Sequence, residues 1–403
     1  MTKLKRELGL FQVTAAGVGI ILGAGIYALI GVAAGGAGNA TWLAFLFSAF
    51  IALLSGLSYA ELSSMFKGNA GEFDYIKAAF NKKLGLVVAL SVIFASIITS
   101  AAVSLGFAGY FIELIPIPYI AAALLLIILM SIINFIGIKE ASWFNTISTF
   151  IEFGGLILII ILGIKYFGSV NYFELPSTGI MGVFSTTALV FFAYLGFDSI
   201  IKLSEETKNP QKTLPIAIIL SILITSIVYV LVAISAVSVV GWETLSQSKA
   251  PLALVAQTAL GGATGPLLAV IALFSTANTV LISMLTASRQ VYGIAKQKSL
   301  PKIFALVHKK TQTPWLAILL ITIFSLLFTL IGDIGLVANI TNLLLFITFA
   351  MVNLSLIVLR YKCEGQHRGF RCPGNIKRFS VVALLGFLTS IFMIGIILKD
   401  FFF

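Results

Sequence analysis

Eleven long apolar segments, separated by shorter polar stretches, constrain this chain more than any other feature of its sequence. Most reach the length of about 20 residues that an α-helix needs to cross a bilayer. Only 10% of the 403 residues are charged, whereas soluble domains carry about 25%. The sequence therefore predicts an all-α integral membrane protein. The expected spans are 9–34, 40–66, 84–112, 119–138, 145–166, 182–203, 214–240, 264–297, 314–331, 335–360 and 379–398.

Positive charges are distributed unequally between the two sets of loops. All but three of the 26 Lys and Arg residues belong to the N-terminal segment and to alternate loops; the exceptions are Lys165, Lys249 and Lys399. The positive-inside rule then predicts a cytoplasmic N-terminus, and the odd number of spans predicts an external C-terminus. We expect a multi-pass protein of the plasma membrane. This bias accounts for the net charge of +11. The basic loops lack interleaved aromatic residues, so we expect no nucleic-acid partner.

Cysteine and histidine usage argues against a metal or haem cofactor. Cys363 and Cys372 share one basic loop at a spacing that fits no zinc site, and we expect both to be free thiols. His308 and His367 also lie in basic loops. Because no His or Cys is expected at membrane depth, the sequence predicts no metal site and no cofactor.

The stretch GIILGAGIYALIG at 19–31 places several glycines inside the first expected span. Glycine in a helix interior costs about 0.5–1 kcal/mol relative to alanine. On one interpretation, Gly19 and Gly23 allow a neighbouring helix to approach closely. On the other, the helix breaks near Gly25 and exposes its backbone to a ligand.

The sixth expected span has a comparable interruption. Gly196 lies near its middle and Asp198 follows, and a carboxylate at membrane depth costs about 2.5–3.5 kcal/mol or more. Asp198 either supports unwound backbone or lies at the solvated end of the helix. Spans one and six are five apart and run in opposite directions, as the broken first helices of an inverted repeat do, which favours the break at Gly25.

We therefore expect two inverted repeats whose broken first helices meet at a substrate site. The expected organisation is a single transport domain over 1–403, a first repeat over 9–166, a second over 182–360 and an extra helix at 379–398.

Several motifs, in this order and spacing, resemble the amino acid–polyamine–organocation (APC) permeases near the cationic amino acid transporter branch. They are GVGIILGAGIY (17–27), YAELSSMFKGNAGEFDYI (59–76), NFIGIKEASWFN (134–145), FFAYLGFDSI (191–200), EETKNPQKTLPIAI (205–218), ALFSTANTVLISMLTASRQVYGIAK (272–296) and FRCPG (370–374). The resemblance implies a LeuT-like 5+5 inverted repeat with broken helices one and six. Members usually have twelve or more helices, so a twelfth helix, outside the transport core, is expected to be missing here.

The resemblance also implies an amino acid site at the two breaks. Free backbone amides at the start of the second half-helix would attract the carboxylate, because a helix N-terminus is positive. Freed backbone carbonyls would accept from the ammonium group. The expected amides are those of Ala24, Gly25 and Ile26, and the expected carbonyls are those of Ile21, Phe192 and Leu195.

The side-chain pocket is expected to draw on later helices. Phe192 would cover the substrate as an aromatic gate, unless it serves ordinary packing, and Ser283 matches a pocket position of the family. Asp198 is the only acidic candidate for binding a cationic side chain. We therefore expect a neutral or apolar amino acid, with arginine, lysine and ornithine left open.

Glu152 lies where many proton-coupled relatives carry a lysine in helix five. It is the only charged residue between Glu140 and Lys165, and an intramembrane carboxylate is a functional hypothesis by default. Three roles remain open: a group that gains and loses a proton, a partner for sodium or a cationic substrate, and a permanently neutral hydrogen-bonding side chain. Ser275 and Asn278 are candidate polar neighbours, together with Thr276.

The predicted function is secondary active transport of amino acids, driven by a proton gradient. Exchange and uniport remain alternatives, because they differ only in how the empty carrier reorients. An ATP-driven pump would carry a nucleotide-binding GxxxxGK[ST] motif, and the sequence contains none. None of its loops is long enough to form the output domain of a sensor. It also shows no catalytic constellation at membrane depth, so we do not expect an enzyme. The expected partners are an amino acid, protons and the lipid bilayer, with the oligomeric state open.

Overall fold

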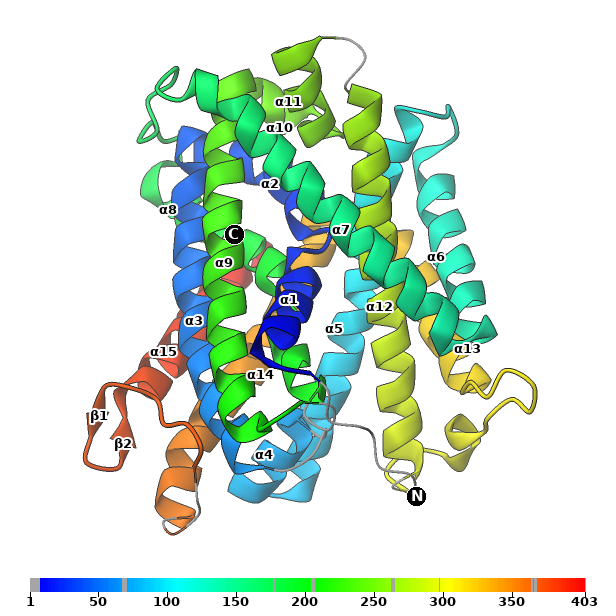
Figure 1. The fold of residues 1–403 in the computed structure, drawn as a ribbon, viewed down its shortest axis with the longest axis vertical. Coiled ribbons are helices and arrows are strands. Elements are labelled where there is room, and N and C mark those ends of the chain that lie inside the picture. Colours follow the sequence, from blue (N-terminus) through cyan, green and yellow to red (C-terminus); the bar gives the residue numbers. More distant parts are fainter. Residues whose placement is uncertain are drawn as a thin grey trace.

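The computed structural model describes residues 8–66, 71–176, 178–203, 207–261, 265–296, 298–363, 365 and 368–402. Most of the long helices lie lengthwise beside one another, while α7 crosses them obliquely (Figure 1). Within the described ranges, nine helical stretches are long and apolar enough to cross a membrane, and α1, α11 and α13 are shorter apolar helices. The prediction of an all-α integral membrane fold is confirmed.

The helices and strands follow the expected order along the chain. The α-helices are α1 (Leu10–Leu22), α2 (Gly25–Ala37), α3 (Thr41–Met65), α4 (Gly71–Ala79), α5 (Lys82–Ile112), α6 (Tyr119–Ile136), α7 (Ile138–Gly163), α8 (Gly179–Val190), α9 (Pro210–Val240), α10 (Trp242–Gln247), α11 (Pro251–Leu260), α12 (Gly265–Lys296), α13 (Trp315–Thr329), α14 (Ile334–Lys362) and α15 (Val381–Phe402). Short 3₁₀ helices are η1 (Gly38–Ala40), η2 (Ile164–Tyr166), η3 (Phe191–Tyr194), η4 (Phe197–Leu203) and η5 (Lys302–Ala305). One antiparallel hairpin joins β1 (Asn375–Ile376) to β2 (Phe379–Ser380).

The expected spans one and six are each divided, and every other expected span corresponds to one helix. The first becomes α1 and α2, and the sixth becomes α8, η3 and η4. Helices α4, α10 and α11 were not expected from the sequence, because each is much shorter than a membrane-spanning helix.

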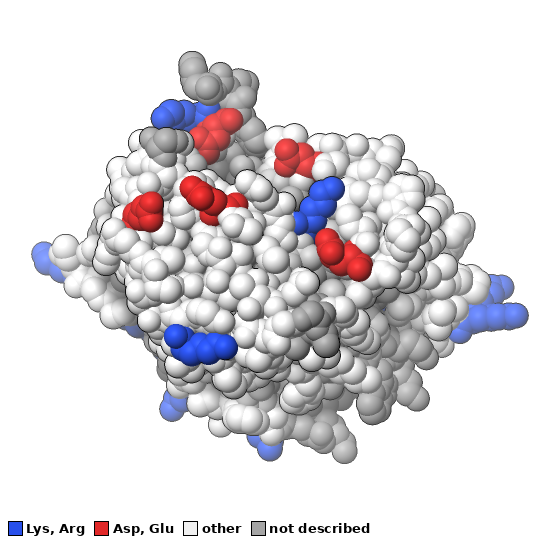
Figure 2. Space-filling view, turned by 90° about the horizontal axis from the view of Figure 1, so that it is seen from above, with Lys and Arg blue, Asp and Glu red and all other residues white. Residues whose placement is uncertain are grey.

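The lateral surface of the bundle is apolar. Large hydrophobic side chains are widely exposed there, including Phe150 on α7 and Ile227 on α9, which are 77% and 62% exposed. Soluble proteins rarely expose extended patches of this kind, whereas lipid chains cover them at no cost. The end that carries α10 and α11 bears only scattered charged side chains (Figure 2).

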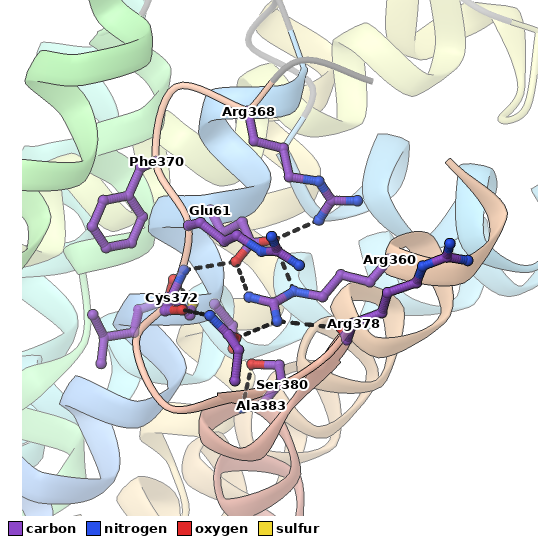
Figure 3. Close-up of polar contacts among 12 residues, drawn as sticks. Glu61, Arg360, Arg368, Phe370, Cys372, Arg378, Ser380 and Ala383 are labelled. Atoms are coloured by element: carbon purple, nitrogen blue, oxygen red, sulfur yellow. Dashed lines mark hydrogen bonds and ion pairs between the residues drawn. The ribbon is translucent and has the colours of Figure 1, made fainter. Parts of the chain in front are cut away.

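A buried ion cluster fastens the segment after α14 to α3. Glu61 of α3 is fully buried and accepts from Arg360 of α14 and from Arg368 (Figure 3). The Arg360 Nε–Glu61 Oε1 distance is 2.9 Å. The backbone amide of Cys372 donates to the other carboxylate oxygen over 2.8 Å. The carboxylate is thus fully hydrogen-bonded, as a buried charge must be.

The two cysteines are free, as the sequence predicted. The Cys372 thiol is buried and donates to the Leu57 carbonyl of α3 over 2.9 Å. Burial raises the pKa of this thiol well above its usual range, and the negative charge of Glu61 raises it further. Cys372 therefore stays protonated and serves as a packed structural residue.

Metal-ligating side chains do not cluster in the part of the chain that the structure describes. No three His, Cys, Asp or Glu residues come together there as ligands would. His308 lies in a loop, where its ring nitrogen Nδ1 is 3.0 Å from the Thr311 hydroxyl, and His367 is outside the described residues.

Candidate functional site

The first break lies between α1 and α2, at Gly23 and Ala24. The amide of Ala24 donates to the Thr279 hydroxyl of α12 over 2.8 Å, and a Cβ on Gly23 would lie 2.6 Å from that oxygen. The helical ladder resumes with the Ala28 amide, which donates to the Ala24 carbonyl. The amides of 25–27 therefore have no acceptor within the helix, as at any helix N-terminus.

The glycines of this stretch serve both of the purposes considered above. A Cβ on Gly19 would lie 2.5 Å from the Thr149 methyl carbon of α7, so this glycine allows close helix packing. A Cβ on Gly25 would overlap the backbone of Ala193 in η3 and would lie 2.7 Å from its Cβ. Gly25 therefore brings the two broken spans into direct backbone contact.

The second break begins where α8 tightens into η3. Leu195 is extended, with φ −63° and ψ 146°, and Gly196 follows with φ +112°, a conformation that favours glycine. A Cβ on Gly196 would also lie 2.7 Å from Ile20 of α1. The chain then continues as η4, so the predicted interruption is present.

Helices α1 and η4 pack against each other, and the chain is hydrogen-bonded at the ends of these two helices that are remote from the breaks. A Cβ on Gly17 of α1 would lie 2.6 Å from the Ile200 side chain of η4. Leu8 and Thr207 form an isolated parallel bridge, in which the Lys208 amide donates to the Leu8 carbonyl over 2.8 Å. The segment before the first break is thus hydrogen-bonded to the segment after the second.

A cavity of about 130 Å³ lies between the two breaks. Its walls come from α1, α2, α5, α7, α12, α14 and the two 3₁₀ helices of the second break. A single enclosed water needs about 10–15 Å³, so this space accommodates a ligand of several heavy atoms. The expected site residues that line it are Gly19, Ile21, Gly23, Ala24, Gly25, Phe192, Leu195, Gly196, Asp198 and Ser283.

Two expected site residues lie behind the cavity wall. The side chains of Ile26 and Glu152 are fully buried and do not line the cavity. Ile26 is in the first turn of α2, so only its backbone amide faces toward the break. Glu152 is on α7, and its side chain does not contact the space that a ligand would occupy.

Several lining residues were not expected from the sequence. Ser96 and Thr99 of α5, Asn145 of α7, and Thr279 and Thr286 of α12 all contribute polar atoms to the wall. A signal was present on α12, since positions 279, 283 and 286 share one face of a helix. Asp198 is the one charged side chain among the residues that line this cavity.

The freed carbonyls at the breaks already take part in hydrogen bonds. The Ile21 carbonyl accepts from the Tyr229 hydroxyl of α9 over 2.8 Å, and the Phe192 carbonyl accepts from the Leu195 amide over 3.3 Å. A carbonyl oxygen has two acceptor positions, so each retains one for a ligand. Tyr229 is a functional candidate that the sequence analysis did not identify, because nothing in its apolar surroundings distinguishes it.

Glu152 lies in a pocket of unpaired polar atoms. Its backbone carbonyl accepts from the Tyr27 hydroxyl of α2 over 2.7 Å. Among the described residues, both of its carboxylate oxygens are buried without a hydrogen-bond partner. The Ser275 hydroxyl lies close to this carboxyl group without reaching hydrogen-bond geometry, and the Asn278 side-chain oxygen one turn along α12 also has no partner among the described residues. Asn278 lines the cavity, and Ser275 precedes it by three residues on the same helix.

Comparison with known proteins identifies the family. The family model described as amino acid permease matches residues 8–399. The branched-chain amino acid permease BcaP of Bacillus subtilis is 29% identical over 97% of this chain and 88% of its own length. The methylthioribose transporter of the same organism is 28% identical over 92% of this chain and 84% of its own length.

A plant relative extends the comparison. Cationic amino acid transporter 5 of Arabidopsis thaliana is 30% identical over 89% of this chain and 66% of its own length. The predicted resemblance is thereby confirmed. This chain belongs to the amino acid permease family of the APC superfamily, near the cationic amino acid transporter branch, and is a membrane permease rather than an enzyme.

Proposed function

We propose that this chain is a secondary active transporter that carries amino acids across the plasma membrane by alternating access. The observation that carries the proposal is the cavity at which both broken spans meet, with Ala24 and Gly25 on one side and Phe192 and Leu195 on the other. A zwitterion suits this arrangement. The positive N-terminus of α2 attracts its carboxylate, and the carbonyls of Ile21, Phe192 and Leu195 accept from its ammonium group.

The proposed architecture is a LeuT-like 5+5 inverted repeat. The first repeat would comprise 9–166 and the second 182–360, with α15 outside both. In support, the two divided spans occupy the first position of each set of five, where transporters with inverted repeats place their substrate. The charge distribution of the loops favours a cytoplasmic N-terminus.

Proton coupling through Glu152 is the proposed energy source. Among the described residues, neither oxygen of its buried carboxyl group has a hydrogen-bond partner, and the nearby Ser275 hydroxyl and the side-chain oxygen of the cavity-lining Asn278 are unpaired as well. A group in this position gains or loses a proton at low cost only when water or the substrate reaches the cavity. Glu152 would then gain and lose its proton in step with the opening of the cavity to each side of the membrane.

Uptake into proteoliposomes tests this coupling. With acid outside and no sodium, wild-type protein is expected to accumulate a labelled amino acid, and a protonophore should abolish the accumulation. Glu152→Gln should lose accumulation while keeping counterflow into preloaded vesicles, because exchange needs no net proton movement. Glu113→Gln, at an exposed glutamate, is the control and should behave as wild type. Undiminished accumulation by Glu152→Gln would show that Glu152 is structural.

A neutral or apolar amino acid is the proposed substrate. The wall beside the breaks is largely apolar, with Val92, Ala95, Ile282 and Leu345 facing the cavity. A cationic amino acid is the second candidate, because Asp198 also faces the cavity. Competition by leucine or by lysine against labelled substrate separates the two.

The Asp198→Asn variant also distinguishes a cationic from a neutral substrate. If the substrate is cationic, this variant should lower its affinity by about tenfold or more, since a hydrogen bond to a charged group contributes about 1.5–3 kcal/mol. If the substrate is neutral, the affinity should change little. Strong competition by lysine that survives Asp198→Asn would mean that Asp198 does not bind the side chain.

A further inference from the structure

Tyr229 of α9 contacts both broken spans at once. Its hydroxyl lies 2.8 Å from the Ile21 carbonyl and 3.0 Å from the Ala193 carbonyl. Ile21 is near the end of α1, and Ala193 is in η3. The two carbonyls therefore belong to different breaks, and one phenol group bridges them.

The phenol approaches these carbonyls from behind the cavity wall. Ile21 and Ala193 line the cavity, whereas Tyr229 does not and is fully buried. Its ring is fixed by edge contacts with Tyr194 and Phe45, at centroid distances of 5.3 Å and 5.8 Å. A hydroxyl has one proton to donate, so the two carbonyls share it.

This geometry has a physical consequence for a ligand on the other side of the wall. Two carbonyl oxygens that converge on one point repel each other unless a donor lies between them. Without the Tyr229 proton, both would be buried with an acceptor position unfilled, at a cost of about 1–3 kcal/mol each. The breaks would then shift to recover hydrogen bonds.

We propose that Tyr229 is a positioning residue for the ammonium group of the substrate. It holds the carbonyls of Ile21 and Ala193 at a fixed separation, so that their remaining acceptor positions, and the neighbouring Phe192 carbonyl, present one preformed site for the ammonium protons. This inference rests on the proposed function as an amino acid transporter. The positioning itself concerns only the two breaks, so it is testable without a known substrate.

Tyr194 supplies a matched control. It is also fully buried, belongs to the same ring cluster, and donates to a backbone carbonyl over 3.0 Å. That carbonyl is Phe45 on α3, which does not line the cavity. Removing either hydroxyl deletes a buried hydrogen-bond donor, but only Tyr229→Phe removes a donor that the two breaks share.

The experiment compares Tyr229→Phe with Tyr194→Phe in lipid nanodiscs. Amide hydrogen exchange is followed over 21–26 and 191–197, and labelled amino acid uptake is followed in proteoliposomes. Tyr229→Phe is expected to speed exchange in both segments and to raise the KM for uptake by about five- to tenfold, the equivalent of one lost hydrogen bond, while keeping the maximal rate. Because Tyr194 belongs to η3 itself, Tyr194→Phe is compared only over 21–26 and in KM, and it should leave both of these near wild type.

Each result decides the inference. Unchanged exchange in Tyr229→Phe, or equal effects of the two variants on exchange and KM, would overturn it. If wild-type protein transports no amino acid, the proposed function fails, and faster exchange at both breaks in Tyr229→Phe alone would still establish Tyr229 as the group that holds them.

Discussion

Replacing Gly25 by alanine is expected to lower substrate affinity and uptake by about tenfold to hundredfold. The added Cβ would overlap the Ala193 backbone, and it would lie 2.7 Å from the Ala193 Cβ. Backbone atoms cannot rotate away as a side chain can, so the two breaks must separate. Overpacking of this kind costs about 1–3 kcal/mol. Equilibrium binding and initial uptake rates measure the effect.

The expected loss in Gly25→Ala is opposite in sign to the usual effect of a glycine-to-alanine exchange in a helix. In an ordinary helix the same exchange stabilises the protein by about 1 kcal/mol. Gly395→Ala on α15 is the control, because a Cβ there would meet no atom within 4 Å, and it should transport normally. Normal affinity in Gly25→Ala would mean that contact between the breaks does not form the binding site.

Removing the carboxylate of the ion cluster is expected to cause the largest loss of stability. Glu61→Ala leaves Arg360 and Arg368 without their shared counter-ion, although their side chains are only 1% and 11% exposed. Breaking a buried ion pair from one side costs about 3–5 kcal/mol. The free energy of unfolding in detergent, measured by denaturant titration, should fall by that amount.

Two comparison variants separate charge from packing. Arg368→Met should cost less than Glu61→Ala, because Arg360 still neutralises the carboxylate. The double variant Glu61→Leu with Arg360→Met should recover part of the loss, since apolar groups of similar size often replace buried ion pairs well. A Glu61→Ala protein as stable as Glu113→Ala would show that the cluster does not support the fold.

The features that could be predicted from the sequence are those that depend on local pattern. The lengths of apolar runs gave the spans, and the glycines near 25 and at Gly196 gave the two breaks. These signals work because a helix must satisfy its own backbone in a membrane. Glu152 was found in the same way, as an isolated charge in an apolar run.

The features that could not be predicted are choices of partner between distant segments. Ala24 and Thr279 are 255 positions apart, yet one hydrogen bond joins them. The pair formed by Glu61 and Arg360 spans 299 positions. Periodicity shows which face of a helix is polar, but it does not say which neighbour that face will meet.

The hydrogen bond between Leu8 and Lys208 has a mechanical consequence. It ties α1 to the chain that follows η4, at the ends of these segments that are remote from the breaks. The helices are interrupted at Gly23 and Gly196, at the opposite ends of the same segments. If the cavity opens toward the end of the molecule where Leu8 and Lys208 lie, either this hydrogen bond breaks or α1 and η4 move together. In the second case the two helices would rotate as one unit about Gly23 and Gly196 and would not move independently.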